Sequence, residues 1–179
     1  MPKVVNLNKL ITGGRGPKTV GDSTFIFDTV QIQKFLINRI KRPDTHFVMG
    51  CAAWLTNTKI LQALSSLRGV SMICTRDKVA RTKSSKEKYK KLRKHAGIPT
   101  IKLLGCGRGR SASLMHHKFL IGMDAHENPI WVSTGSFNLT ESACTNIENL
   151  QVIENPAVAK IYMQEFKRLF TIAKPLPLK

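Results

Sequence analysis

Hydrophobic and polar residues alternate along this chain with two different spacings, which together predict interleaved strands and helices. Short, mostly apolar runs rich in Val, Ile and Phe are typical of buried strands. Between these runs, apolar residues recur every three or four positions, as on one face of a helix. Such an alternation favours a single α/β domain in which helices cover a sheet. The predicted strands are 24–27, 46–53, 70–74, 100–104, 114–122, 130–133 and 149–153.

Capping and helix-breaking residues mark where the predicted helices begin and end. Asn57 can cap a helix, and Asn155-Pro156 combines a cap with a proline in the first turn. Pro43 closes the first helix, and Gly69 closes the helix that starts at Asn57. These signals agree with the apolar periodicity, so the helices are predicted on two independent grounds.

The length and composition fit one domain with an adequate core, because 42% of the 179 residues are hydrophobic. We expect a basic, flexible N-terminal segment over 1–22, a folded domain over 23–172 and a C-terminal tail over 173–179. The chain has no apolar run long enough to span a membrane, and its N-terminus lacks the features of a secretory signal. We therefore expect a cytoplasmic protein, or one already trimmed, without stable membrane association. The cysteines are far apart in sequence, which favours free thiols over a zinc site or disulfides; they are Cys51, Cys74, Cys106 and Cys144.

The charge balance points to a polyanionic partner. Lys and Arg number 29 against 11 Asp and Glu, a formal net charge of +18. Nucleic acid is the leading candidate, because binding strengthens with each phosphate that is neutralised; an anionic membrane surface is second. A basic protein without a special partner is the third reading. We expect phosphate contacts from the basic segment 76–94 and the glycine-rich loop 105–111, although a merely solvated helix face is the alternative for the first; the candidate residues are Lys83, Lys86, Lys90, Arg108 and Arg110.

Two neighbouring motifs carry the candidate chemistry. His116 and Lys118 are two residues apart in a predicted strand, so both should lie on one face. The turn Gly135-Ser136-Phe137-Asn138 follows and supplies small polar donors. A nucleophile or acid, a fixed cation and hydrogen-bond donors suit a phosphodiester substrate.

These residues resemble the signature of the phospholipase D superfamily, which is His-x-Lys, then Gly-Ser-x-Asn, then a downstream acid, here Glu148. The resemblance covers roughly 23–172 and is greatest to the short bacterial endonucleases, which carry one motif copy per chain. It implies a phospholipase D-like mixed β-sheet flanked by helices. The chain departs from the family at the aspartate that usually follows five residues after the lysine. Met123 occupies that position and Asp124 comes one later, which is consistent with a local bulge.

The resemblance also implies a mechanism. With one motif copy per chain, a symmetric homodimer should assemble the site from two copies of His116, one as nucleophile and one as general acid. Lys118 and Asn138 would hold the phosphate oxygens, Glu148 would accept a hydrogen bond from a His116 ring nitrogen, and Ser136 would add a contact beside it. No metal or other cofactor is implied. The expected function is metal-independent cleavage of nucleic acid, DNA before RNA, through a phosphohistidine.

Other readings remain open at this stage. A phospholipase or cardiolipin hydrolase would use the same chemistry, although the sequence shows no exposed apolar segment for lipid chains. A nucleic-acid-binding protein with little catalysis is a third possibility. We interpret His117 as structural because it should face away from His116, and we expect Trp54 to pack in the core rather than at a cleft.

Overall fold

The computed structural model describes residues 16–105 and 113–178. The helices within these ranges are α1 (Thr29–Ile40), α2 (Thr58–Ser65), α3 (Lys83–Lys90) and α4 (Pro156–Ile172), with short 3-10 turns η1 (Val79–Arg81) and η2 (Ser142–Thr145). The strands are β1 (Lys18–Val20), β2 (Ser23–Ile26), β3 (Phe47–Ala52), β4 (Gly69–Thr75), β5 (Ile101–Leu104), β6 (Lys118–Met123), β7 (Pro129–Gly135), β8 (Leu150–Ile153) and β9 (Lys174–Pro175).

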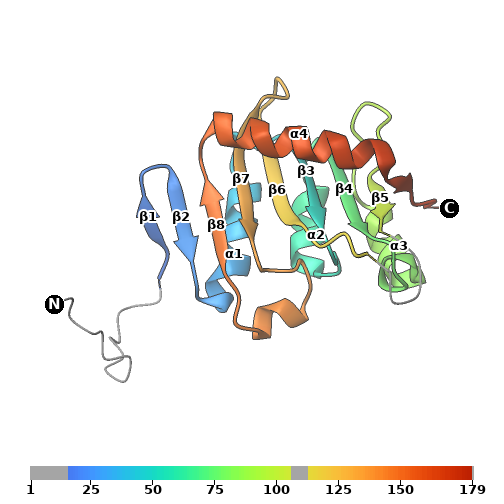
Figure 1. The fold of residues 1–179 in the computed structure, drawn as a ribbon, viewed down its shortest axis with the longest axis horizontal. Helices are drawn as coiled ribbons and strands as arrows, with labels where there is room; N and C mark the ends of the chain where they lie inside the picture. The colour runs from blue at the N-terminus through green and yellow to red at the C-terminus, as the bar shows by residue number, and fades with distance from the viewer. Residues whose placement is uncertain (1–15, 106–112, 179) are drawn as a thin grey trace.

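All strands of the described residues belong to one mixed sheet, in the order β1-β2-β8-β7-β6-β3-β4-β5-β9 (Figure 1). Strands β3, β4 and β5 are parallel, and the other pairs are antiparallel. The helix that follows β3 and the segment that follows β4 provide the crossovers that parallel strands require. The predicted α/β domain with a mixed sheet between helices is therefore confirmed.

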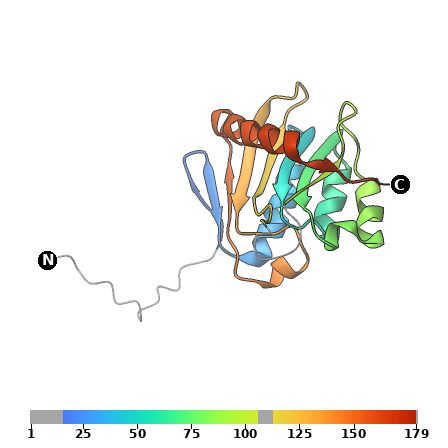
Figure 2. The same ribbon diagram turned by 45° about the vertical axis from the view of Figure 1, so that its right-hand side comes forward.

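The helices cover the two faces of the sheet unequally. Helix α4 crosses one face alone, while α1 and α2 lie behind the other face (Figures 1 and 2). Each face has its own apolar cluster, one built on Leu36, Ile60 and Tyr89 and the other on Met163 and Phe166. No helix of the described residues is long and apolar enough to cross a membrane.

The predicted caps form as expected. The side chain of Asn57 accepts a hydrogen bond from the Ile60 N–H at 3.0 Å, and Asn155 accepts from Ala157 and Val158 at 2.9 and 3.2 Å. In α3 the cap is Thr82, which accepts from the Ser85 N–H at 3.1 Å. These bonds satisfy N–H groups that have no partner within the helix.

The structure corrects the predicted ends of the domain. Lys18–Val20 form β1 and pair with β2, so the N-terminal segment is not flexible up to residue 22; residues 1–15 lie outside the described part. The predicted C-terminal tail contains β9, which pairs with β5, and Leu176, whose N–H donates to the Ile101 carbonyl at 3.0 Å. Both additions are short edge strands, which carry too few apolar residues to be recognised by periodicity.

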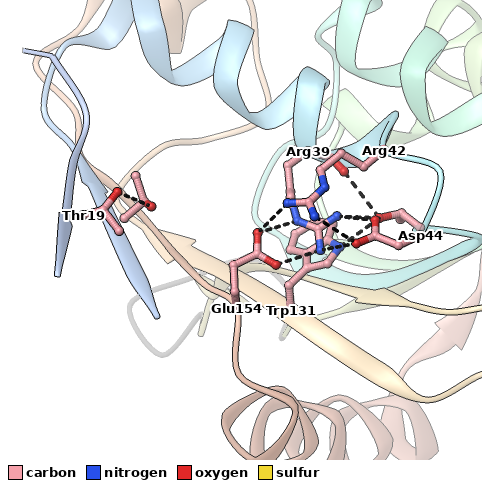
Figure 3. A network of polar contacts seen from close by, with 8 residues as sticks. Thr19, Arg39, Arg42, Asp44, Trp131 and Glu154 are labelled. Atoms are coloured by element: carbon pink, nitrogen blue, oxygen red, sulfur yellow. Dashed lines mark hydrogen bonds and ion pairs between the residues drawn. The ribbon is translucent and has the colours of Figure 1, made fainter. Parts of the chain in front are cut away.

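A buried arginine ties α1 to the end of β8, away from the predicted catalytic motifs. Arg39 is 3% exposed and forms a two-pronged ion pair with Glu154, with nitrogen–oxygen distances of 2.7 and 2.9 Å (Figure 3). It also pairs with Asp44 at 2.9 Å and stacks over the Trp131 ring, with 4.8 Å from the guanidinium carbon to the ring centre. Gly122 makes room for that ring, since a Cβ there would lie 1.9 Å from the indole nitrogen.

The cysteines within the described residues are free thiols, as predicted for Cys51, Cys74 and Cys144; Cys106 lies outside those residues. Burial raises the pKa of Cys74 to about 12 and also raises the pKa of Cys51. Both therefore remain protonated thiols that pack in the core rather than reactive groups.

Candidate active site

The residues of both motifs meet where the central strands begin or end, along the lower side of the sheet in Figure 1. The start of β6 is Lys118, which pairs with Ala52 at the end of β3. The end of β7 is Gly135, which pairs with Leu150 at the start of β8. Antiparallel pairing thus brings the His116 segment, the Gly135 turn and the Glu148 loop to the same edge.

His116 itself lies just before the strand, which corrects the predicted strand 114–122. Strand β6 begins at Lys118, and the preceding residues are held by individual contacts. The Thr75 hydroxyl donates to the Met115 carbonyl at 2.5 Å, and the Lys118 ammonium donates to the His116 carbonyl at 2.9 Å. The imidazole is exposed at the sheet edge while its backbone is fixed on both sides.

Trp54 belongs to the site, contrary to the expectation that it packs in the core. It is half-buried, and its ring meets His116 edge-on with 6.0 Å between ring centres. Its indole N–H donates to the Asp77 carboxylate at 2.5 Å, which fixes the ring plane. A backbone bridge between Leu55 and Leu139 holds this segment against the Asn138 turn. The one available signal was its place directly after a buried strand.

The Gly135 turn is built for close approach to the Glu148 loop. A Cβ on Gly135 would lie 2.3 Å from the Asn149 carbonyl oxygen, so glycine is required there. The next residue, Ser136, accepts a hydrogen bond from the Asn149 N–H at 3.0 Å and donates its hydroxyl to Glu148. Asn146 also donates to Glu148, at 3.4 Å.

The predicted bond between Glu148 and His116 is absent from the hydrogen bonds of the described residues. Glu148 instead accepts from Ser136 and Asn146, which hold its carboxylate at the turn. Its charge acts on Lys118, because it raises the pKa of that ammonium. Partial burial outweighs this effect, so the pKa of Lys118 is lowered from its usual value.

Asn138 has bonding capacity that the described residues do not use. Its Oδ1 atom is buried and has no hydrogen-bond partner, which is uncommon for a buried polar atom. The residue lines a hollow of about 470 Å³ together with Trp54, Thr140 and Asn146. The hollow is thus lined in part by Trp54, the residue whose ring contacts His116.

A larger groove runs along the other side of His116. It measures about 660 Å³ and is lined by His116, His117 and apolar residues, namely Leu104, Leu114, Met115, Leu169 and Ile172. Leu114 and Ile172 are 55% and 58% exposed. The site therefore joins a polar centre to an apolar groove that the sequence pattern did not reveal.

His117 lines the apolar groove next to His116, but its side chain contacts α4 and β6. Its Nε2 atom lies 3.4 Å from Glu165, which also pairs with Arg168 at 2.7 Å. Its ring is tilted against Phe119, with 5.9 Å between centres. The interpretation of His117 as a structural residue agrees with these contacts.

Asp124 closes the hairpin between β6 and β7, at the opposite edge of the sheet. Its carboxylate accepts from the His126 and Asn128 N–H groups at 2.9 and 2.8 Å. These bonds, with one from the Asn128 amide, hold the pKa of Asp124 below its usual range. The strand register shifts at Gly122/Met123, which is the bulge that the displaced aspartate suggested.

Three of the residues predicted to contact nucleic acid lie on α3, outside the two motifs. Lys83, Lys86 and Lys90 are on α3, and Lys90 is paired with Glu87 at 2.7 Å. Arg108 and Arg110 lie outside the described residues. Of the three lysines, Lys90 is the one that forms an ion pair within the described residues.

Comparisons with known proteins agree with this geometry. The family described as cardiolipin synthase, PLD-like domain, matches residues 36–170. "Uncharacterized protein L381" of Acanthamoeba polyphaga mimivirus is 27% identical over 205 aligned residues, covering 94% of this chain and 72% of that protein.

Solved structures share the fold. NucT from Helicobacter pylori has a TM-score of 0.67 at 16% identity, covering 86% of this chain and 98% of NucT. Nuc from Salmonella typhimurium, a phospholipase D family member, has a TM-score of 0.57 at 17% identity, covering 80% of this chain and 90% of Nuc. The family match spans most of the sheet and both motifs, and the chain therefore belongs to the PLD-like family of the phospholipase D phosphodiesterase superfamily.

Proposed function

We propose that this protein cleaves nucleic acid, DNA foremost, by metal-independent phosphodiester hydrolysis in a site shared between two copies of the chain. The observation that carries the proposal is His116, exposed at the sheet edge beside the half-buried Lys118. The net charge of +18 suits a polyanionic substrate. Family membership makes phosphodiester chemistry the starting expectation.

The reaction proceeds in two displacements. A ring nitrogen of one His116 attacks phosphorus, the bond to one strand oxygen breaks, and His116 of the partner subunit gives that oxygen its proton. A water molecule then attacks the phosphohistidine, gives its proton to His116 of the partner subunit, and frees the first histidine. Lys118 and the Asn138 amide stabilise the charge on the phosphate oxygens. Trp54 holds the imidazole in place, while Glu148 raises the pKa of Lys118 and so favours the charged ammonium.

The edge that carries His116 also exposes apolar side chains suited to a second copy. Ile147 is fully exposed and directly precedes Glu148, and Val30 is 78% exposed. The Thr29 hydroxyl donates to the Asn146 carbonyl at 2.6 Å. Val30 follows Thr29 and Ile147 follows Asn146, so this bond brings the two apolar residues near each other. Exposed apolar groups beside an incomplete two-histidine site support a dimer across this edge.

Replacing Ile147 with aspartate is expected to weaken the dimer at least about tenfold and to lower activity in parallel, because an unpaired carboxylate would be buried in the interface. Light scattering over a range of concentrations, with cleavage assayed on the same samples, measures both effects. Val20→Asp is the matched control, since Val20 is 70% exposed on β1. An Ile147→Asp protein that stays dimeric and active would exclude this edge as the interface.

Replacing Glu148 with glutamine should move the alkaline limb of the pH–rate profile to lower pH. The negative charge of Glu148 raises the Lys118 pKa, so its removal lowers that pKa further. Activity that needs the charged ammonium is present below this pKa and disappears as the pH rises through it. Glutamine keeps an acceptor for the Ser136 hydroxyl, so the turn is preserved. An unmoved limb in kcat/KM would show that Lys118 does not act as a cation in the rate-limiting step.

Hydrolysis of a phospholipid is the second candidate, and the apolar groove beside His116 favours it. Leu114 and Ile172 give that groove an exposed hydrophobic wall that an acyl chain could contact. The sequence predicted no exposed apolar segment for lipid chains, and this prediction is wrong for Leu114 and Ile172. The net charge of +18 still makes nucleic acid the better-supported substrate.

The deciding experiment compares substrates in excess EDTA. Supercoiled plasmid, a labelled single-stranded oligonucleotide and cardiolipin-containing vesicles are each incubated with the wild-type protein. We expect nicked or cleaved DNA and intact lipid. Release of a lipid headgroup with intact DNA would assign the protein to lipid hydrolysis, and activity that disappears in EDTA would contradict a metal-independent mechanism.

A further inference from the structure

A basic hollow beside the outermost strands β5 and β9 lies outside the catalytic centre. It has a volume of about 320 Å³, with four cationic side chains, Arg76, Arg81, Lys86 and Lys174, around an apolar base that includes Leu103 and Leu176. Arg76, Arg81 and Lys174 are exposed, and Lys86 is half-buried. No acidic residue lines the hollow among the described residues.

Three separate parts of the chain bring these charges together. Arg76 directly follows β4, and its N–H donates to the Leu104 carbonyl at 2.8 Å. Arg81 ends η1, and Lys86 lies on α3. Lys174 comes from β9, where it pairs with Leu103 across the sheet edge. The short C-terminal strand therefore completes a cluster that no sequence window contains.

Within the described part of the chain, the charges of this cluster are not neutralised. Across residues 16–105 and 113–178, none of the four cations takes part in an ion pair. The acid next to Arg76, Asp77, accepts from the Trp54 indole and the Ala80 N–H instead. Like charges gathered without counterions repel one another, so a bound anion would relieve this cost. Arg side chains bind phosphate through two parallel hydrogen bonds, which suits this anion.

The hollow is close to the catalytic histidine. Thr75 and Met115 are joined by a hydrogen bond of 2.5 Å, and Arg76 and His116 are the residues next to them. Standard chain geometry then places the α carbons of Arg76 and His116 roughly 15 Å apart or less. At the 3.4 Å spacing of nucleotides along one strand of B-form DNA, this upper limit corresponds to about four nucleotides.

We infer that this hollow is a phosphate subsite that binds the backbone of a nucleic acid strand within about four nucleotides of the cleaved bond. The inference rests on the proposed function and specifies where the backbone phosphates of the substrate bind. Four cations over an apolar base, with no base-reading pattern, fit contacts to phosphate and sugar, which position a strand without reading its sequence. A free phosphate or nucleotide has the same chemistry and is the competing occupant.

The test compares wild type with an Arg81→Gln/Lys174→Gln variant, and with Lys34→Gln/Lys41→Gln as a control of equal charge change on and beside α1. Binding of a labelled single strand of about 20 nucleotides is followed by fluorescence anisotropy across salt concentrations. Losing two phosphate contacts should weaken binding and reduce the slope of log K against log salt by about 1.4. The control should keep the wild-type slope.

Cleavage gives a second reading. The ratio of kcat/KM for the long strand to that for a dinucleotide should fall several-fold in the Arg81→Gln/Lys174→Gln variant, because only the long strand reaches the hollow. A wild-type slope and a wild-type ratio in this variant would overturn the inference. A second outcome would also overturn it: equal salt slopes for the two proteins, together with a thermal stabilisation by inorganic phosphate that only the wild type shows. That result would assign the hollow to a free anion. A wild type that binds the strand but never cleaves it would refute the proposed nuclease activity, while the slopes alone would still decide the subsite.

Discussion

Replacing His116 with alanine is expected to lower kcat/KM for DNA cleavage by about 10⁴-fold or more, the scale seen when an attacking group is removed. The loss is large because a dimer would lose both its nucleophile and its general acid through one substitution. Binding of DNA should change little, since the basic surface is untouched. Cleavage of labelled DNA in EDTA, with the two proteins purified in parallel, measures the effect.

His117 provides the matched control for this experiment. It is the adjacent residue and is also exposed, but it contacts Glu165 and Phe119 on the α4 side. His117→Ala should therefore cleave within about threefold of wild type, as exposed substitutions usually change energies by only about 0.5 kcal/mol. Equal losses in both variants would mean that the segment, rather than the His116 imidazole, is what matters.

Mixed dimers separate a shared site from two independent sites. If wild-type and His116→Ala chains are unfolded and refolded together in equal amounts, only about a quarter of the dimers contain two intact histidines. Activity per total protein should fall to about a quarter of the pure wild-type value under the shared-site mechanism. Retention of about half would indicate that each chain works alone, and the two-histidine mechanism would be wrong.

The helices and inner strands could be predicted because local signals agree with global packing there. Asn57 and Asn155 are capping residues that precede apolar periodic segments, and both cap helices in the structure. The inner strands are almost entirely buried, so they are mostly apolar and stand out in sequence. The outer strands β1 and β9 have three and two residues, and neither has an apolar run to reveal it.

The fold brings the motif residues to one end of the sheet, but their individual contacts were not all predictable. Glu148 was expected to bind His116, whereas it accepts from Ser136, because the Gly135 turn brings the serine to the Asn149 backbone. Trp54 was assigned to the core because a large aromatic after a buried strand usually packs inside. Its neighbour in space, His116, comes 62 positions later in the sequence, and no periodicity encodes that contact.

The arrangement of charges in the basic segment 76–94 could not be predicted from the sequence either. Its excess of lysine and arginine predicted phosphate contacts, but gave no indication which charges gather together. Lys90 is paired with Glu87, and Lys88 donates to the Thr56 carbonyl at 3.0 Å. Lys86 instead joins a hollow completed by Lys174, a residue of the expected tail. A charge becomes a candidate contact only when the fold leaves it without a partner.

Replacing Arg39 with methionine is expected to destabilise the folded protein by about 2–4 kcal/mol, which makes it the largest stability effect we predict. Methionine keeps much of the apolar stem but removes the guanidinium that binds Glu154 and Asp44 and stacks on Trp131 (Figure 3). The two carboxylates are 38% and 41% exposed, so water recovers part of the loss and the cost stays below that of a fully buried charge. Urea unfolding followed by circular dichroism measures the change.

Arg42→Met is the control, because Arg42 pairs with the same two carboxylates at 3.3 and 3.5 Å but is 55% exposed. Both substitutions remove one positive charge beside Asp44 and Glu154, so a general charge effect would appear in both. Arg42→Met should change stability by no more than about 0.5 kcal/mol. Equal destabilisation by the two variants would contradict a specific role for the buried guanidinium. A much larger loss from Arg39→Met would show that α1 and the end of β8 are joined by this ion pair over Trp131, at the edge of the sheet opposite His116.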